Sequence, residues 1–529
     1  MPKNPTVGRV VVYPASGGLE TISIPGTQTV GRLTSGSNFM VDINGAKKKH
    51  PGISRSHDRT TIVTPGFVTG NTRGLFDFWR TSGTSKVQRT TLVSGGRVLA
   101  ENANGLYVDV TGAFVIIPTD NVSMETFFGL LVLAFESNPG SVPIRFNGTN
   151  LAALGGTPPN ARYLRTWQNR LWASGIPTAP DRLQASVIDN PEDWTALGGA
   201  ITINIDQGDQ DPIGITSLFP PLFGRMVVGK RRSLYEVTPV GTTFSVRTLI
   251  TGLGSISHNA VAMADNDIYF VSERGIHSLL MTEKFGELET SFLSFSIQNY
   301  FQENIDFRRA ENMRAIYVPE INSYLLAATT RGAARNDVVL GYNFALKEWY
   351  RIDENVSAMA KYVDPQDGRK TKVIVANDNG DVGILDTTKS GRVVTWFGSR
   401  RTTQFTTGII YPINVVTEVG FKKLTCFFRP QTTGSRFTVS YIVNGDFVED
   451  LTFPMDPLSG SLIGSAIIGV NKIGGQGIVK QVTRQLKGTG HAIELVFTHA
   501  PVTDEEDFEL YGFVIEYEYT GESETPETQ

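Results

Sequence analysis

The chain has 529 residues, of which 40% are hydrophobic and 19% charged, with a formal net charge of −4. This length exceeds what a single hydrophobic core usually supports and predicts several domains. The near-neutral charge excludes a tight, general nucleic-acid binder, which needs an electropositive surface.

Cys426 is the single cysteine and lies in the apolar stretch LTCFF. One cysteine excludes an intramolecular disulfide framework, and the apolar context predicts a buried, inert thiol. No stretch approaches the roughly 18 apolar residues of a membrane span, and the N-terminus lacks the apolar core of a signal peptide. We therefore expect no membrane insertion and no export by a signal peptide.

Residues 1–50 predict a thin N-terminal arm rather than a domain with its own core. A hairpin is expected between strands at 7–13 and 19–24, with its turn at Ser16, Gly17 and Gly18. The basic run Lys47–Lys49 follows, directly before the first repeating strands.

Short strands separated by turn-forming residues recur between residues 51 and 390. Residues 163–194 show the pattern most clearly, with Trp167 and Trp172 in strands and Pro177 and Pro180 in the turn. Two strands this short cannot bury their own faces, so they need similar neighbours. The recurrence predicts an all-β fold containing a β-propeller of about six to seven irregular blades. The expected blades span about 60–110, 122–154, 163–194, 213–249, 260–280, 313–352 and 359–385.

Asparagine–glycine pairs mark five of the predicted hairpins, because both central residues of a type I′ turn need positive φ. These pairs begin at Asn44, Asn104, Asn147, Asn379 and Asn444. A single helical pattern, at 291–309, is expected to be an insertion between blades.

From about residue 391 the expected strands become longer and alternate polar with apolar residues, as in FELYGFVIEYEY. This texture predicts a C-terminal antiparallel β-sandwich over 391–520; its role as a platform is implied only by the family resemblance described below. The last nine residues, 521–529, are acidic and contain proline, which predicts a disordered tail.

The sequence contains no recognisable signature of an active site. It lacks a phosphate-binding loop, an H-E-x-x-H zinc motif and a G-x-S-x-G nucleophile motif. We therefore expect no catalytic residue, no cofactor and no metal. Asn377, Asn379 and Asp381 offer three oxygen ligands at a spacing that suits calcium, but a hairpin turn explains the same residues. Trp167, Trp172, Trp194 and Trp349 fit a sugar-binding platform, but packing between blades is the favoured interpretation.

Clusters of like charge are the remaining candidates for contact surfaces. They are interpreted either as solvated faces or as contacts to phosphate groups and neighbouring subunits. The acidic loop 504–507 is expected to pair with a basic cluster of the next subunit, and deletion of 391–529 to leave a folded propeller that does not assemble. The candidate interface or channel residues are Lys47, Lys48, Lys49, Lys230, Arg231, Arg232, Arg400, Arg401, Asp504, Glu505, Glu506 and Asp507.

Several segments together resemble the propeller-bearing tail hub and tail nozzle proteins of short-tailed bacteriophages. They are Pro51-Gly52-Ile53, the pairing of NRLWASGIPTAPDRLQASVIDNPEDW (169–194) with ITINIDQGDQDPIGI (201–215), and LFGRMVVGKRRSLYEV followed by residues 250–280. Within 250–280, Tyr269, Phe270 and Gly275 match the family's aromatic strand and its glycine turn. The resemblance covers about residues 51–390.

The resemblance implies a virion structural protein and not an enzyme, since the family has no catalytic residues to carry over. It implies a homo-hexameric ring in the viral tail that forms a channel for DNA ejection. The implied partners are a tail adaptor, tail fibre or tailspike proteins, and genomic DNA that passes without sequence-specific binding. The expected location is the virion tail, assembled in the bacterial host cytoplasm.

Two alternatives come from other classes of protein. A propeller carbohydrate-active enzyme would need two carboxylates facing one pocket, for which Asp206, Asp209 and Glu348 are the candidates. A host-surface-binding module would instead use exposed loops such as 137–143 and 330–337.

Overall fold

The computed structural model describes residues 7–519 except 24–26, 43, 58–69, 83–84, 137–141, 207, 209–210, 281–291, 365–367, 369, 389–392, 432–433 and 457–478. The described chain is all-β, with many small antiparallel sheets. It divides into two compact units. One contains residues 53–340 and 354–385, and we call it the sheet ring. The other contains residues 1–52, 341–353 and 386–529, and we call it the terminal unit.

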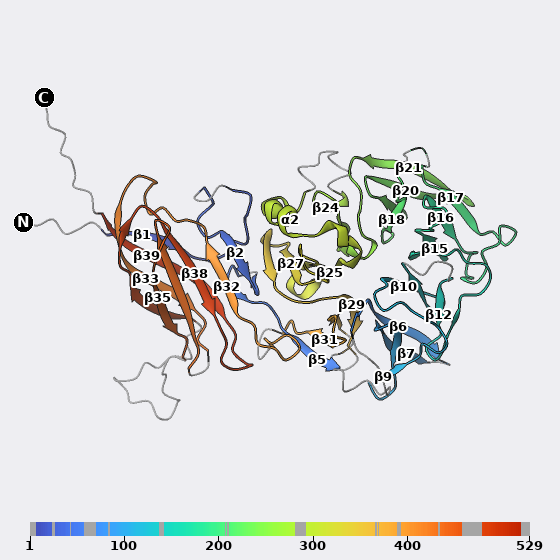
Figure 1. Ribbon diagram of the computed structural model, residues 1–529, viewed down its shortest axis with the longest axis horizontal. Helices are drawn as coiled ribbons and strands as arrows, with labels where there is room; N and C mark the ends of the chain where they lie inside the picture. The colour runs from blue at the N-terminus through green and yellow to red at the C-terminus, as the bar shows by residue number, and fades with distance from the viewer. Residues whose placement is uncertain are drawn as a thin grey trace, which may run out of the picture. The chain divides into compact units, whose positions relative to one another are not determined.

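The sheet ring is built from short sheets that follow one another in chain order, as the colour progression from β6 to β31 in Figure 1 shows. The first four are β6 (Gly74–Ser82), β7 (Ser85–Ser94), β8 (Arg97–Glu101), β9 (Tyr107–Asp109); β10 (Val122–Phe127), β11 (Leu130–Phe135), β12 (Ile144–Phe146), β13 (Leu151–Ala153); β14 (Tyr163–Trp167), β15 (Arg170–Ser174), β16 (Arg182–Ala185), β17 (Ile201–Asn204); and β18 (Ile215–Leu218), β19 (Met226–Lys230), β20 (Ser233–Val240), β21 (Thr243–Thr251).

Three further sheets complete the series. They are β22 (Ala262–Ala264), β23 (Asp267–Val271), β24 (Ile276–Ser278); β25 (Arg314–Val318), β26 (Ser323–Ala328), β27 (Val338–Asn343), β28 (Glu348–Ile352); and β29 (Ala358–Val363), β30 (Thr371–Ala376), β31 (Val382–Leu385), β5 (Ile53–His57). Strand β28 is counted with the terminal unit. The last sheet therefore combines three strands from residues 358–385 with one strand from residues 53–57.

Between most successive sheets the first strand of one contacts the first strand of the next, and between β18 and β25 the contacts run through η3 (His258–Ala260). These contacts arrange the sheets around a centre. Strand β10 contacts β6 and β14, β14 contacts β18, β25 contacts β22 and β29, and β29 contacts β6 again. Hydrophobic clusters fill the space between successive sheets; one of them joins Trp172 and Leu183 of the third sheet to Val228 and Tyr235 of the fourth. The series is therefore closed, and its core is divided among the gaps between sheets.

Helices are short in the part of the chain that the structure describes. They are η3 (His258–Ala260), η4 (Phe295–Ile297), α2 (Gln298–Asn304), η5 (Phe307–Asn312) and η6 (Pro319–Ile321). The helical pattern expected at 291–309 is thus broken into one short α-helix between two 3₁₀ segments. Among the described residues, no helix has the length and apolar character to span a bilayer.

The terminal unit contains two antiparallel sheets whose aromatic residues pack together. One holds β1 (Val7–Val12), β3 (Phe39–Val41), β4 (Lys47–Lys49), β33 (Val419–Phe428), β36 (Lys480–Gln485), β37 (Thr489–Gly490) and β39 (Glu509–Tyr519). The other holds β2 (Leu33–Ser37), β32 (Thr403–Thr407), β34 (Arg436–Val443), β35 (Asp446–Pro454) and β38 (Ile493–His499). Ring contacts such as Phe428–Phe437 and Phe497–Phe513 join the two sheets.

The N-terminal region does not form the expected hairpin. Strand β1 pairs with β39, about 500 residues away, and β2 pairs with β32. Local sequence shows where a strand alternates but not which distant edge satisfies its backbone groups. Deletion of 391–529 would remove the partners of β1 and β2, so it is not the clean domain removal that the sequence suggested. The expected tail at 521–529 lies outside the described residues.

Candidate functional site

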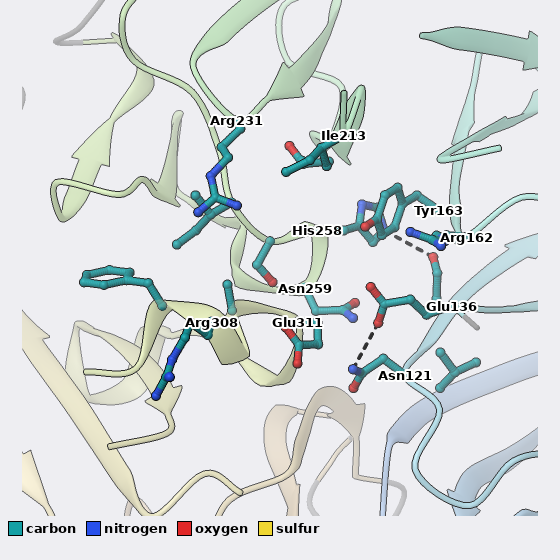
Figure 2. Close-up of a pocket in the computed structure, with 17 residues that line it drawn as sticks. Asn121, Glu136, Arg162, Tyr163, Ile213, Arg231, His258, Asn259, Arg308 and Glu311 are labelled. Carbon is teal, nitrogen blue, oxygen red and sulfur yellow. Dashed lines mark hydrogen bonds between the residues drawn. The ribbon is translucent and has the colours of Figure 1, made fainter. Parts of the chain in front are cut away.

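The centre of the sheet ring contains two cavities that share lining residues. The smaller cavity has a volume of about 260 Å³ and the larger one about 470 Å³, and both are lined by Val122, His258 and Asn259. For reference only, we label the smaller one the outer cavity and the larger one the deeper cavity. Figure 2 shows the outer cavity, where side chains from several sheets and from η5 converge. Together these two spaces, which we call the central cavity, form the candidate functional site.

Four polar residues that line the central cavity occupy similar places in their sheets. Arg73, Asn121 and Arg162 stand directly before β6, β10 and β14, and Arg314 begins β25. In a ring of similar sheets, the residue before each first strand reaches the same face. This recurrence was available in the sequence, but it has meaning only once the register of the sheets is known.

His258 is held as a neutral hydrogen-bond donor. Its Nδ1 accepts from the backbone N–H of Leu218 at 3.1 Å, so the proton is on Nε2, which lies 3.2 Å from Ser123 Oγ. Burial lowers the pKa of His258 well below its usual range. Ser123 Oγ also accepts from the N–H of Leu164 at 3.1 Å. Because His258 donates to this hydroxyl, the pair is not arranged as a base and its nucleophile.

Two glutamates face the outer cavity, and Figure 2 shows them pointing into the same space as Asn259. Glu136 accepts a hydrogen bond from Asn121 at 3.1 Å. Burial raises the pKa of Glu311, and the negative charge of Glu136 raises it further. The cavity therefore holds two carboxylates that interact electrostatically, a pair that the sequence did not reveal.

Arginines line the deeper cavity. Arg165 pairs with Glu125 at 3.4 Å and donates to the carbonyl of Leu218 at 3.0 Å. Arg314 is buried, and burial together with the nearby charge of Arg73 lowers its pKa to about 10. Burial also lowers the pKa of Arg73 itself.

Acid is expected to destabilise the sheet ring through His277, a residue of β24 outside the central cavity. Neither ring nitrogen has a hydrogen-bond partner among the described residues, and burial lowers the pKa of His277 to about 4. The unfolded chain binds a proton near pH 6.5 and the folded chain only near pH 4, so stability is lost as pH falls between these values. We expect the free energy of unfolding of the His277→Phe variant to fall less steeply between pH 7 and 4.5, as measured by urea unfolding at each pH. An unchanged slope in this variant would contradict the assignment.

The basic run that seemed to be a surface is largely buried. Side chains alternate along a strand, so Lys47 and Lys49 of β4 point to one face and Lys48 to the other. Lys47 Nζ donates to the carbonyl of Ala15 at 2.6 Å, and burial lowers its pKa to about 7. Lys49 and Glu506 are also buried. These three residues are therefore corrected from contact candidates to parts of the core, whereas Lys48 pairs with Asp42 at 3.0 Å.

The acidic loop finds a partner within its own chain. Arg400 Nε lies 2.6 Å from Asp504 Oδ1, and Arg401 donates to the carbonyl of Asp353 at 3.3 Å. Asp504 and Glu505 are exposed, and Asp507 is half-buried. The sequence predicted that this loop pairs with a basic cluster of a neighbouring subunit. In the structure, Asp504 of the loop instead pairs with Arg400 of its own chain.

The second basic cluster is split where β19 ends, since Lys230 is the last residue of that strand and Arg231 and Arg232 lie in the turn that follows. Lys230 is fully buried and pairs with Asp181 at 2.7 Å, which removes it from the contact candidates. Arg231 pairs with Glu273, and Arg232 is exposed. Both arginines line a hollow of about 360 Å³ on the sheet ring together with Arg274.

The carboxylates proposed for an enzyme do not come together. Asp206 accepts a hydrogen bond from the hydroxyl of Tyr235 at 3.0 Å, Glu348 pairs with Arg32 at 2.8 Å in the terminal unit, and Asp209 lies outside the described residues. Of the surface loops, 137–141 lies outside them as well. Trp167 and Trp172 pack between sheets, as favoured, and Cys426 is buried with its pKa raised by burial.

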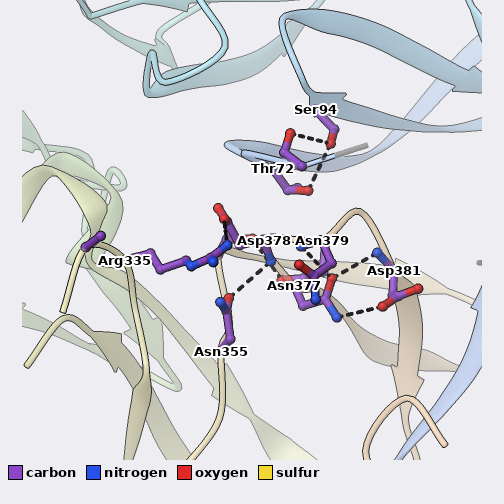
Figure 3. A network of polar contacts seen from close by, with 12 residues as sticks. Thr72, Ser94, Arg335, Asn355, Asn377, Asp378, Asn379 and Asp381 are labelled. Carbon is purple, nitrogen blue, oxygen red and sulfur yellow. Dashed lines mark hydrogen bonds and ion pairs between the residues drawn. The ribbon is translucent and has the colours of Figure 1, made fainter. Parts of the chain in front are cut away.

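The acid-rich turn at 377–381 is a hairpin turn between β30 and β31 (Figure 3). Asn377 Oδ1 accepts from the N–H groups of Asn379 and Asp381 at 3.0 and 2.9 Å, and its Nδ2 donates to Asp381 at 2.9 Å. Neighbouring Asp378 pairs with Arg335. The oxygens that suited calcium are thus used to build the turn.

Comparison with known proteins finds no matching family model and no similar curated protein. Solved structures are similar at low identity. A chain of a mitotic checkpoint complex is 12% identical with a TM-score of 0.37, covering 61% of this chain and 93% of its own. The extracellular domain of the putative hybrid two-component system BT4673 from B. thetaiotaomicron is 11% identical with a TM-score of 0.36, covering 81% and 60%.

An exo-β-1,3-galactanase from Phanerochaete chrysosporium is 8% identical with a TM-score of 0.24, covering 88% of this chain and 100% of its own. The expectation that the chain is not an enzyme is corrected by this match and by that of another glycoside hydrolase. This correction means only that enzymatic activity is no longer excluded for this chain. TM-scores this low assign no activity, substrate or residue to this chain.

Proposed function

We infer that the sheet ring is a seven-bladed β-propeller and that the terminal unit is a β-sandwich. Contacts that link β6, β10, β14 and β18, that link β22, β25 and β29 back to β6, and that join β18 to β25 through η3 support the first inference. Strand β5, added to β31, supplies the fourth strand of the last blade and ties the two ends of the propeller together. Aromatic contacts between the two sheets of the terminal unit support the second inference.

We propose that the chain is a subunit of the tail hub or tail nozzle ring of a short-tailed bacteriophage. One observation carries the proposal: the segments that resemble this family meet in the fold. Lys230 of the segment VVGKRR pairs with Asp181 of 169–194 and donates to the carbonyl of Asp206, within 201–215, at 2.9 Å. Motifs separated by about 50 residues therefore form one interlock between the third and fourth sheets.

A second contact in the same place supports the interlock. The backbone N–H of Ile215 donates to the carbonyl of Pro180 at 3.0 Å. Gly214 has a φ of +72°, and a Cβ built on it would lie 2.4 Å from that carbonyl oxygen. Glycine is required there for both conformation and space. The sequence features shared with the family thus serve the packing of neighbouring blades.

The proposed mechanism is mechanical. Six copies would form a homo-hexameric ring around a channel through which genomic DNA leaves without sequence-specific contacts. The low net charge of −4 suits this role, because many phosphate contacts would retain DNA rather than let it slide. A tail adaptor and tail fibre or tailspike proteins would be the neighbours in the virion tail, after assembly in the host cytoplasm.

Assembly of the purified full-length chain tests the proposal. Six copies of the 57.8 kDa chain are expected to give a particle of about 350 kDa by light scattering, with a ring visible by electron microscopy. The matched measurement is antibody labelling of virions, which should mark the tail. A monodisperse monomer at high concentration in several buffers, together with unlabelled virions, would rule the proposal out.

A further inference from the structure

Among the described residues, the guanidinium of Arg73 is a buried cation without a hydrogen-bonded partner. The residue is 9% exposed, it lines the deeper cavity, and its Nε has no acceptor in the described part of the chain. Within the described chain, its guanidinium forms no hydrogen bond and no ion pair. Buried charges in folded proteins are normally paired, because the cost of taking an ion out of water is large.

A second buried guanidinium lies beside it. Arg314 Nη2 donates to the carbonyl of Arg73 at 3.1 Å and to Asn121 Oδ1 at 2.8 Å, and its Nη1 donates to the carbonyls of Glu311 and Met313. All four acceptors are neutral. Among the described residues, Arg314 pairs with no carboxylate, so two neighbouring positive charges are left without a direct counter-ion.

The carboxylates nearest to Arg73 are engaged elsewhere. Asp378 and Glu311 both act on Arg73 through their charge. Asp378 is paired with Arg335, and Glu311 lines the outer cavity. In the deeper cavity itself, Asp77 accepts hydrogen bonds from Trp79, Gln88 and the backbone N–H of Val363. These donors are neutral and leave the charge of Asp77 in place, but the lining also includes the four cations Arg73, Arg165, Arg314 and Lys361, so positive charge is in excess in the deeper cavity.

We propose that the deeper part of the central cavity binds a phosphate-like oxyanion at Arg73, next to Arg314. A guanidinium presents a planar fork of N–H donors that matches two oxygens of such an anion. A volume of about 470 Å³ accommodates the anion with water molecules, and the shared wall at Val122, His258 and Asn259 connects it to the outer cavity. The bound anion would tie the first and sixth sheets together at the centre of the sheet ring.

Thermal unfolding of the full-length protein tests the site. The protein is freed of oxyanions and titrated with inorganic phosphate, with sodium chloride lowered in step to keep ionic strength constant. We expect a saturable rise in Tm of about 2–5 °C, because a ligand that binds the folded state stabilises it. A parallel titration with glycerol 3-phosphate distinguishes a free ion from the phosphate group of a larger molecule. A Tm that does not respond to phosphate would overturn the proposal.

Variants separate binding from a structural role of the arginine. Arg73→Met should abolish the phosphate response, and Arg73→Lys should shift its midpoint to about tenfold higher phosphate, since charge is kept but the fork is lost. Arg97→Gln, at an exposed pair with Asp109 in the same sheet, should leave the response unchanged. Equilibrium dialysis with radiolabelled phosphate should show one ion per chain, and none in Arg73→Met. An undiminished response in both Arg73 variants would overturn the site.

Discussion

Replacing Trp172 by alanine is expected to lower the free energy of unfolding of the sheet ring by about 3–5 kcal/mol. Trp172 is fully buried in the cluster between the third and fourth sheets, where its ring meets Phe244 edge-on at 4.9 Å between centroids. Its Nε1 donates to the carbonyl of Trp167 at 3.0 Å. Truncation would leave a cavity there and remove this hydrogen bond.

Urea unfolding followed by far-UV circular dichroism measures this effect without relying on tryptophan fluorescence. Phe223→Ala is the matched control, because Phe223 is an aromatic residue 66% exposed at the turn between β18 and β19. Its expected cost is within about 0.5 kcal/mol. If both variants unfold at the same urea concentration, the space between the third and fourth sheets is not a tight core.

Replacing Lys230 by methionine is expected to cost about 3–5 kcal/mol, the range found when one partner of a buried ion pair is removed. Methionine keeps most of the stem but leaves the carboxylate of Asp181 without its 2.7 Å partner. The carbonyl of Asp206 also loses its donor. The change therefore removes the two contacts by which Lys230 holds the segments 169–194 and 201–215, and leaves the hydrogen bond between Ile215 and Pro180 in place.

Lys487→Met provides the control for this second variant. Lys487 pairs with Glu449 at 2.8 Å, but its side chain is 72% exposed, and such surface pairs contribute about 0–1 kcal/mol. Adding Asp181→Asn to Lys230→Met should restore part of the lost stability, since the unpaired charge is then removed. A Lys230 variant as stable as the Lys487 variant would show that the interlock does not hold the two sheets together.

Local signals in the sequence predicted local structure well. Each of the five asparagine–glycine pairs joins two strands that pair with each other, as between β12 and β13 or β34 and β35. The glycine of every pair has positive φ, which explains why glycine stands there, but the asparagine has positive φ only at Asn444, so the two positive φ values expected of a type I′ turn occur in one pair of the five. The burial of Trp172 and Cys426 was predictable in the same way, from apolar residues on both sides.

Such local signals do not predict which distant strands pair or which residues meet in the central cavity. Nothing near Val7 indicates that β39 will pair with it, and nothing near Ile53 indicates β31. The run Lys47–Lys49 looks exposed by composition, yet pleating turns two of its three side chains inward. Arg73, Glu136 and Arg314 become neighbours only when the sheets close into a ring, so their shared site has no motif in the sequence.

The pairing of β5 with β31 delays the completion of the last sheet while the protein is being synthesised. About 330 residues separate the two strands, and at 5–20 residues per second a ribosome needs roughly 15–65 s to make them. For that interval β5 has no strand to pair with, and the last sheet cannot be completed. Backbone groups on an unpaired strand edge readily pair with other chains. Crowded polysomes, in which many nascent copies lie side by side, would therefore be where this protein most needs a chaperone.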